Sequence, residues 1–379
     1  MDRDHTKSMT ESVQHDPVAK RLLRCVWRRS LDLLVMSSGW GATRSDTPQI
    51  FYGGARAGDV GGPKVKVQRL QQFFPEKLLG FNAVYLLSNA PYLSASAIAR
   101  LKSRHVPIVL NQNGVFYPGW FAGDWRAKNS EMAIGYHAAD HVFYQSAFCK
   151  AAADEFLGPR DQSGEILFNA IDTDHFSPRD DFTAARIPYR YLLTGKIGGH
   201  LFYRLETAIR GLAGVRAEGL DAALEIAGWL EPDALSRAEH LVNELGIGSH
   251  VEFSGSYTQE EAPTIYRRAD AYIMTKHNDP CPNTVIEALA CGLPIVYSDS
   301  GGVPELVVDC GVRLECEKSW EEAKSPQLSD VIAGMLTVQK NHSSLAEKAR
   351  ERAVKTFDIR GWIERHRLVF DQFLNRKDV

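Results

Sequence analysis

Short, nearly continuous apolar runs recur along the chain from residue 50 onward, and stretches of helical composition separate them. In the first half these runs cover Ile50–Tyr52, Val84–Leu87, Ile108–Leu110, Val142–Tyr144 and Ile166–Phe168. Runs that do not alternate apolar with polar residues indicate strands covered on both faces, as in a parallel sheet between helices. The pattern therefore predicts βαβ units with right-handed crossovers.

A turn-rich, charged break at residues 177–182 interrupts this rhythm, which then restarts. The second set of runs covers Tyr191–Leu193, Leu224–Ala227, Val251–Phe253, Ala271–Met274 and Ile295–Tyr297. The chain has 379 residues, and single hydrophobic cores stop growing beyond roughly 250 residues. We therefore expect an α/β fold with two Rossmann-like, doubly wound domains. Open sheets of this kind bind ligands at the carboxyl ends of their strands, so a cleft between the two domains is the expected binding site.

The breaks in the pattern predict four segments. Residues 1–48 form an N-terminal extension, 49–178 the first domain, 179–355 the second domain, and 356–379 a C-terminal helix that packs back on the first domain. The core-facing positions expected on that helix, about residues 359–373, are Trp362, Leu368, Val369 and Phe373.

Composition excludes several classes of protein. The net charge is −3, which gives no support to a nucleic-acid binder. No apolar stretch approaches the roughly 20 residues of a membrane span. The six cysteines include no CxxC pair and no Cys/His cluster at zinc spacing, so neither a structural metal nor a disulfide scaffold is expected. This cysteine pattern, and the lack of a secretory signal, predict a cytoplasmic protein.

Residues 18–36 combine positive charge with apolar side chains at helical spacing. Lys20, Arg24 and Arg28 recur every four residues, and five positive charges precede the first acid, Asp32. Two interpretations stay open. The helix packs on the domain surface with solvated arginines, or it lies peripherally on the inner face of the cytoplasmic membrane with its Trp and Leu side chains in the interface.

The densest set of candidate binding residues follows the expected strand 271–274. A proline-constrained loop leads into a helix that starts near Asn283, and Pro282 suits that start because its missing N–H would be unpaired there. Free N–H groups at a helix start form a site for a diphosphate. Here they belong to Asn283, Thr284 and Val285. Asp279 and Glu287, eight positions apart, can face the same ligand, where carboxylates accept hydrogen bonds from sugar hydroxyls.

The run from Asp279 to Glu305 closely resembles the donor-site signature of retaining glycosyltransferases with the GT-B fold, family 4 (glycosyl transferases group 1). The signature has two acids eight positions apart, a CG-x-P-[IV]-V strand and a D-x-GG-x-P-E turn. Phe168–Pro178 is similar to the family's interdomain segment and Ala139–Ser146 to one of its strands. Asp59–Gly62 is similar to the glycine loop through which the backbone approaches the donor phosphates.

The resemblance implies a transferase that moves a sugar from a nucleotide-diphosphate sugar to a hydroxyl of a glycan, a lipid-linked acceptor or a polysaccharide precursor, with retention and without a metal. The catalytic residues that it implies are Lys196, Asp279 and Glu287. The expected donor-binding residues are Gly61, Gly62, Gly195, His200, Pro282, Asn283, Thr284 and Val285. The expected acceptor-side residues are Asn111, Asn113 and Trp120.

Three departures from the family pattern keep an alternative open. The family's second phosphate-binding lysine is missing, and either His200 or Arg204 is the candidate to replace it. Asp279 stands where Glu is usual, and Asn111–Asn113 stand where many relatives place a histidine. The Asn113–Gly114 pair is equally typical of a simple turn, and the aromatic stretch around Trp120 of a buried core. The alternative function is a GT-B-like module that binds nucleotide sugar without turnover.

Overall fold

The computed structural model describes residues 18–37, 47–58 and 62–375. The first sheet has five parallel strands in the order β1-β2-β3-β4-β5. They are β1 (Ile50–Phe51), β2 (Ala83–Leu87), β3 (Ile108–Gln112), β4 (His141–Tyr144) and β5 (Gly164–Ile166). On the other side of β1, Ile50 forms a parallel bridge with Glu76. The chain therefore winds outward from β1 to Glu76 and then returns to β2, so the direction of winding reverses beside β1.

Helices cover both faces of this sheet because its strands are apolar on both sides. Val84 and Leu86 pack toward one face, and Ala83 and Tyr85 toward the other. The first face holds α1 (Val18–Ser37), α3 (Ala95–Ser103), α4 (Trp125–Ala138) and α5 (Ala147–Leu157). The opposite face holds α2 (Gly62–Gln71) and α13 (Ile359–Leu374). We call this sheet and its helices the N-terminal lobe.

The second sheet has six parallel strands in the order β11-β10-β9-β6-β7-β8. They are β6 (Tyr189–Thr194), β7 (Ala222–Ala227), β8 (Val251–Gly255), β9 (Ala271–Met274), β10 (Ile295–Ser298) and β11 (Gly311–Leu314). Winding runs from β6 to β8 and then restarts at β9, so the strand order reverses between β6 and β9. Such a reversal leaves a crevice at the carboxyl ends of the two strands.

Helices also cover both faces of the second sheet, and together they form the C-terminal lobe. One face holds α6 (Phe202–Ala217), α7 (Pro232–Glu244) and α11 (Leu328–Lys340). The other holds α8 (Ala262–Arg267), α9 (Asn283–Ala290), α10 (Val303–Val307) and α12 (His342–Thr356). Two short 3-10 turns, Gly199–Leu201 and Gly248–His250, precede α6 and β8.

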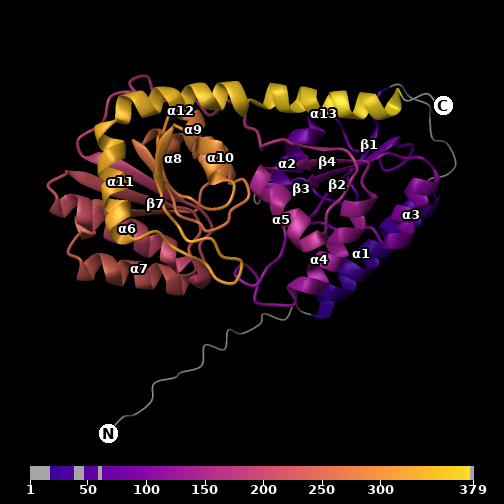
Figure 1. The fold of residues 1–379 in the computed structure, drawn as a ribbon, viewed down its shortest axis with the longest axis horizontal. Helices are drawn as coiled ribbons and strands as arrows, with labels where there is room; N and C mark the ends of the chain where they lie inside the picture. The colour runs from indigo at the N-terminus through magenta and orange to yellow at the C-terminus, as the bar shows by residue number, and fades with distance from the viewer. Residues whose placement is uncertain (1–17, 38–46, 59–61, 376–379) are drawn as a thin grey trace, which may run out of the picture.

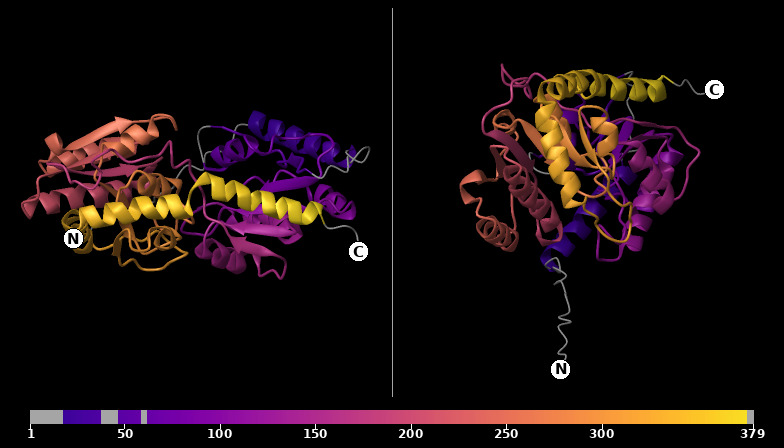
Figure 2. Two further views of the ribbon diagram at one scale, coloured as in Figure 1. Left: turned by 90° about the horizontal axis from the view of Figure 1, so that it is seen from above. Right: turned by 60° about the vertical axis from the view of Figure 1, so that its left-hand side comes forward.

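The chain crosses between the lobes twice, at one place. The segment after β5 carries it into the C-terminal lobe, and the junction of α12 and α13 carries it back (Figures 1 and 2). The two crossings pair with each other, because the Ile171 N–H donates to the Phe357 carbonyl at 2.8 Å and the Ile359 N–H donates to the Ile171 carbonyl at 2.9 Å. The side chains of α13 then enter the core of the N-terminal lobe.

The expected fold class, two doubly wound α/β domains of GT-B type, is confirmed. One core prediction on α13 is wrong: Leu368 is half exposed, whereas Trp362, Val369 and Phe370 are buried. Each residue turns a helix by about 100°, which places Leu368 on the face opposite to the buried one. The buried face of α13 consists of Trp362, Ile363, His366, Val369 and Phe370. Phe370 takes the place expected for Leu368.

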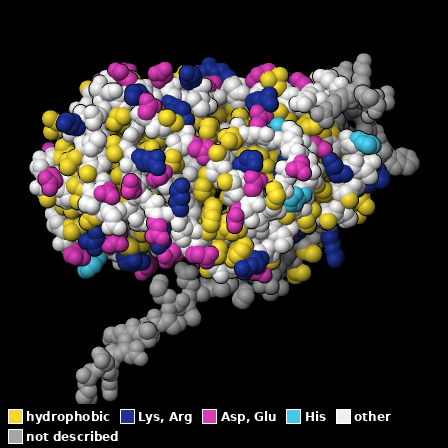
Figure 3. Space-filling model, in the orientation of Figure 1, with side chains coloured by type: hydrophobic (Ala, Val, Ile, Leu, Met, Phe, Trp, Pro, Cys, Tyr) yellow, Lys and Arg dark blue, Asp and Glu magenta, His cyan; other side chains and the backbone are white. Residues whose placement is uncertain are grey.

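Among the residues described, no helix is long and apolar enough to span a bilayer. On the face of the molecule shown in Figure 3, acidic and basic side chains are interspersed. That distribution fits the small net charge of the chain.

Candidate active site

A cleft of about 480 Å³ lies where the carboxyl ends of the two sheets meet. Its walls come from both lobes. The N-terminal lobe contributes Lys66, Asn89, Asn113, Gln145 and residues after β5 such as Asn169. The C-terminal lobe contributes the ends of β6 and β9, the loop after β9 and the start of α9. The cleft therefore occupies the crevice at which the winding of the second sheet reverses.

The start of α9 forms one part of the C-terminal wall. Pro282 is the N-cap, and no side chain caps this end of the helix. Pro282, Asn283 and Thr284 all line the cleft, and the buried Oδ1 of Asn283 has no hydrogen-bond partner. The first N–H groups of a helix have no partner within it and carry partial positive charge. This end of α9 is therefore suited to an anionic ligand.

Two cations after β6 form a second part of the same wall. Gly195 adopts a φ of 147°, and a Cβ there would lie 3.1 Å from the Arg204 guanidinium, so the close packing requires glycine. Arg204 is buried and donates to the Thr194 carbonyl at 3.1 Å, but its Nε has no partner. Lys196 is exposed at the cleft, with its Nζ 4.9 Å from the Trp229 ring centroid.

His200 lies outside the cleft. It is exposed, it does not line the cleft, and its ring stands edge-on to Trp120 with the centroids 6.2 Å apart. Of the two candidates for the missing second cation, the structure therefore brings Arg204 and not His200 to the cleft.

The two acids of the motif both line the cleft in different surroundings. Asp279 forms an ion pair with Lys276 at 2.8 Å, and both residues lie on the loop after β9. Glu287 is buried and accepts a hydrogen bond from the Tyr266 hydroxyl at 2.8 Å. Burial raises the pKa of the Glu287 carboxyl, and the nearby Arg69 guanidinium partly opposes that rise.

Amide side chains at the strand ends of the N-terminal lobe surround Lys66, a residue of α2. The Lys66 Nζ donates to Asn111 Oδ1 at 2.6 Å and lies 3.4 Å from Asn113 Oδ1. The Gln145 Nε2 donates to the same two oxygens. Asn111 itself is fully buried beneath this cluster and does not line the cleft. The sequence prediction included Asn111 and Asn113 but missed Lys66.

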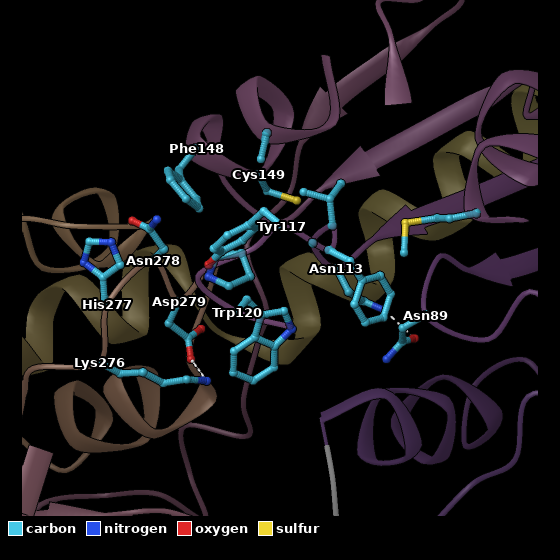
Figure 4. A pocket seen from close by; sticks show the side chains of 16 residues that line it. Asn89, Asn113, Tyr117, Trp120, Phe148, Cys149, Lys276, His277, Asn278 and Asp279 are labelled. Atoms are coloured by element: carbon cyan, nitrogen blue, oxygen red, sulfur yellow. Dashed lines mark hydrogen bonds and ion pairs between the residues drawn. The ribbon is translucent and has the colours of Figure 1, made fainter. Parts of the chain in front are cut away.

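A smaller pocket of about 190 Å³ opens beside the cleft and shares Asn89, Asn113, Lys276, Asp279 and Pro280 with it. Its other walls come mainly from the largely apolar segment after β3 and from α5, with Met132 of α4 and with His277 and Asn278 of the loop after β9. In Figure 4, the Lys276–Asp279 pair enters from the C-terminal lobe, while Tyr117, Trp120 and Asn113 enter from the N-terminal lobe. Trp120 is 43% exposed, so part of its ring faces solvent.

Direct contacts between the lobes border these cavities. The Glu305 carboxylate accepts the N–H groups of Ala147 and Phe148, at 2.7 and 2.8 Å, and so caps the start of α5 from the other lobe. The Ser146 hydroxyl donates to the Pro280 carbonyl at 2.6 Å. A Cβ on Gly302 would lie 2.1 Å from that carbonyl oxygen, which gives the glycine pair of the D-x-GG-x-P-E turn a packing reason.

A second contact between the lobes is aromatic. The Gly119 N–H donates to the Trp320 carbonyl at 2.7 Å. The Trp320 ring lies 4.8 Å from Tyr117 and 5.3 Å from Phe148, measured between centroids. Trp320 therefore inserts into the N-terminal lobe beside the smaller pocket.

The remaining expected donor-binding residues are Val285, Gly61 and Gly62. Val285 is on α9, but its side chain is in the core and its N–H donates to the Pro282 carbonyl at 3.2 Å, so it does not offer the free donor that was expected. Gly62 is the first residue of α2, while Gly61 lies outside the described residues. Within the residues that the structure describes, no group of three or more His, Cys, Asp and Glu side chains could hold a metal ion.

Comparisons with known proteins agree with the fold and with the resemblance seen in the sequence. Residues 200–352 match the family model described as glycosyl transferases group 1. A GDP-mannose-dependent alpha-(1-6)-phosphatidylinositol monomannoside mannosyltransferase of Mycolicibacterium smegmatis is 32% identical over 225 residues, which are 55% of this chain and 56% of the relative. The chain thus matches about half the length of this curated relative.

Solved structures match over most of the chain. HepE of Anabaena in complex with UDP has a TM-score of 0.63 at 14% identity and covers 81% of each chain. WaaG, a glycosyltransferase involved in lipopolysaccharide biosynthesis, has a TM-score of 0.57 at 15% identity and covers 86% of this chain and 99% of its own. At these identities the likeness shows the fold.

The two facing lobes and the cleft between them form a GT-B fold. Residues 200–352, which supply most of the C-terminal wall, match the glycosyl transferases group 1 model, and this match confirms the resemblance seen in the sequence.

Proposed function

We propose that the protein is a glycosyltransferase that moves a sugar from a nucleotide-diphosphate sugar to a hydroxyl acceptor with retention of anomeric configuration. The observation that carries the proposal is the composition of the cleft. Four cationic side chains, an uncapped helix start and two carboxylates line it together, between two sheets whose strand ends face each other. In this proposal residues 179–355 bind the donor and residues 49–178 hold the acceptor.

The cations and the start of α9 have the chemistry needed for a departing diphosphate. Cleavage at the anomeric carbon develops negative charge on that group, and preorganised donors stabilise it most where water is excluded. Lys196 and Arg204 would supply two positive charges, and the N–H groups of Asn283 and Thr284 would add the positive end of the α9 helix dipole. Arg204 would thereby replace the second lysine that the family pattern has and this chain lacks, and its unpartnered Nε supports that role.

The acids and amides divide between the donor sugar and the acceptor. Asp279 would accept hydrogen bonds from the donor sugar at the point where the cleft and the smaller pocket meet, and Glu287 would accept from the ribose. The acceptor would then enter through the smaller pocket, beside Asn113 and Trp120. No protein nucleophile is needed if the leaving phosphate oxygen takes the acceptor's proton.

The surface of α1 supports a membrane-presented acceptor. Leu31 and Val35 pack into the core, but Leu22, Leu23 and Val26 are each more than 60% exposed on a helix that also carries exposed arginines. Both interpretations of this segment therefore have support: one face packs on the lobe, and another is free to lie on an anionic bilayer. The lipid-based acceptor in the name of the M. smegmatis relative points the same way.

A thermal-shift panel tests the donor site. Wild type, Glu287→Gln and Glu225→Gln would be heated with GDP, UDP, ADP and their sugar conjugates, beginning with GDP-mannose because of the relative's name. Glu225 is a buried carboxylate of the same lobe outside the cleft, so it controls for loss of one buried charge. A ligand at 100 times its Kd adds about 2.7 kcal/mol of stability.

One nucleotide series should shift wild type and Glu225→Gln, and shift Glu287→Gln less. No shift from any nucleotide would refute the proposal. Binding without transfer to any acceptor in a follow-up assay would instead favour the module without turnover.

Sedimentation with anionic vesicles tests the membrane surface. Replacing Leu22, Leu23 and Val26 by serine should reduce the sedimented fraction, whereas Leu79→Ser, an exposed leucine of the same lobe, should not. Equal sedimentation of both variants and wild type would remove the membrane from the proposal.

A further inference from the structure

Lys66 is a buried lysine whose ammonium group borders the cleft. Its side chain is only 5% exposed, yet it lines the cleft from the N-terminal lobe, opposite Lys196 and Arg204. Two of its contacts are the amide oxygens of Asn111 and Asn113, the closer at 2.6 Å. An ammonium has three N–H donors, so this arrangement leaves donor capacity for a ligand in the cleft.

Among the residues that the structure describes, no negative charge compensates this ammonium. None of their ion pairs involves Lys66, and the charged group among them that bears on it is Arg69, another cation. The thiols of Cys281 and Cys149 lie near it, but burial raises both pKa values to about 12, so they are neutral at pH 7. His366 is also neutral, because burial lowers its pKa to about 3.

We propose that Lys66 binds a phosphate oxygen of a substrate, and that this anion supplies the negative charge that balances the Lys66 ammonium. The inference rests on the proposed function, because it requires a phosphate-bearing ligand in this cleft. A buried cation without an acid partner is costly, and an anionic ligand beside it would offset that cost. The amides around Lys66 orient it but carry no charge, which leaves the ionic contact to the ligand.

Binding should therefore move a proton. Burial lowers the pKa of Lys66 to about 7, so at pH 8 most of the free protein carries a neutral amine at this position. A phosphate beside the nitrogen would favour the charged form, and the protein would take up about 0.9 proton per ligand at pH 8. The phosphates of a nucleoside diphosphate are already deprotonated there, since their last pKa is about 6.

The phosphate has two sources, and calorimetry in two steps separates them. In the first step GDP or UDP, whichever binds, is titrated into the protein at pH 8 in two buffers of different ionisation enthalpy. In the second step glycerol 1-phosphate is titrated into the nucleotide complex. Proton uptake in the first step assigns Lys66 to the donor diphosphate, and uptake confined to the second step assigns it to a phosphate carried by the acceptor.

Two variants connect the uptake to Lys66. Lys66→Met should abolish it, and Lys196→Met should weaken nucleotide binding while keeping the uptake per nucleotide bound. Nucleotide binding without uptake in either step, or uptake that persists in Lys66→Met, would overturn the inference and leave the glycosyltransferase proposal standing. Failure of every nucleotide to bind would remove the proposed function and the inference together.

Discussion

Replacing Lys66 by methionine should stabilise the folded protein at neutral pH, and the gain should shrink as the pH rises. Methionine has nearly the same length as lysine and suits a site that is only 5% exposed. Asn111 Oδ1 and Asn113 Oδ1 keep a donor in the variant, because Gln145 Nε2 bonds to both. The substitution therefore removes a buried charge without leaving an orphaned acceptor.

The magnitude follows from the pKa of Lys66, which burial lowers from its ordinary 10.5 to about 7. Each unit corresponds to about 1.4 kcal/mol, so burying the charge costs at most about 5 kcal/mol below pH 7. Between pH 7 and 10.5 the unfolded chain holds a proton that the folded chain has released, so the free energy of unfolding of the wild type rises with pH. The slope is about 1 kcal/mol per pH unit near pH 8.

Urea unfolding at pH 6.5, 7.5, 8.5 and 9.5 would measure the free energy of unfolding of wild type, Lys66→Met and Lys64→Met. Lys64 is an exposed lysine two positions away on the same helix and serves as the matched control. The stability difference between wild type and Lys66→Met should be largest at pH 6.5 and close toward pH 9.5. Parallel pH profiles for the two proteins would refute the argument that Lys66 is buried without a counter-charge.

Three further outcomes are expected from other parts of the molecule. Arg204→Gln should weaken nucleotide binding at least tenfold, about 1.4 kcal/mol, whereas His200→Gln should leave Kd unchanged; equal effects in calorimetry would contradict the placement of these residues. Trp362→Ala should cost about 3–5 kcal/mol of stability, whereas Leu368→Ala on the same helix should cost little, as denaturant midpoints will show. Glu305→Gln should lower stability by about 1 kcal/mol, measured as a reduced Tm, because it removes the charged cap from α5; an unchanged Tm would argue against that contact.

The fold was predictable because buried parallel strands leave a direct pattern in the chain. Nine of the expected runs lie on strands β1 to β4 and β6 to β10, and the tenth overlaps β5 only at Ile166. β11 was missed because its sequence, Gly311–Leu314, contains a glycine and an arginine and forms an edge of the sheet, where burial is partial. Helix α1 was predicted within one residue, since its apolar and basic positions share a period of 3.6.

The candidate site was predictable where its residues lie close together in the sequence. Asp279, Pro282, Asn283 and Glu287 lie in one loop and one helix, so their proximity follows from local geometry. Lys66 could not be predicted in this way, because the amide side chains that surround it come from the ends of strands β3 and β4, which are distant in the sequence. The structure was also needed to decide whether His200 or Arg204 replaces the missing lysine. The two residues are one helical turn apart, and only the structure shows that Arg204 faces the end of β6.

The two lobes are joined by two chain segments that are hydrogen-bonded to each other at Ile171 and Phe357. Away from these crossings, the Glu305 cap and the Trp320 ring also hold the lobes together. A separation of the lobes that turns about these crossings would have to break the Glu305 and Trp320 contacts. These contacts border the two cavities, so they would control how often the lobes separate. In enzymes whose site must open to release product, such a step can limit turnover. Loosening Trp320 would thus alter the rate of a complete cycle without touching any group that binds the sugar.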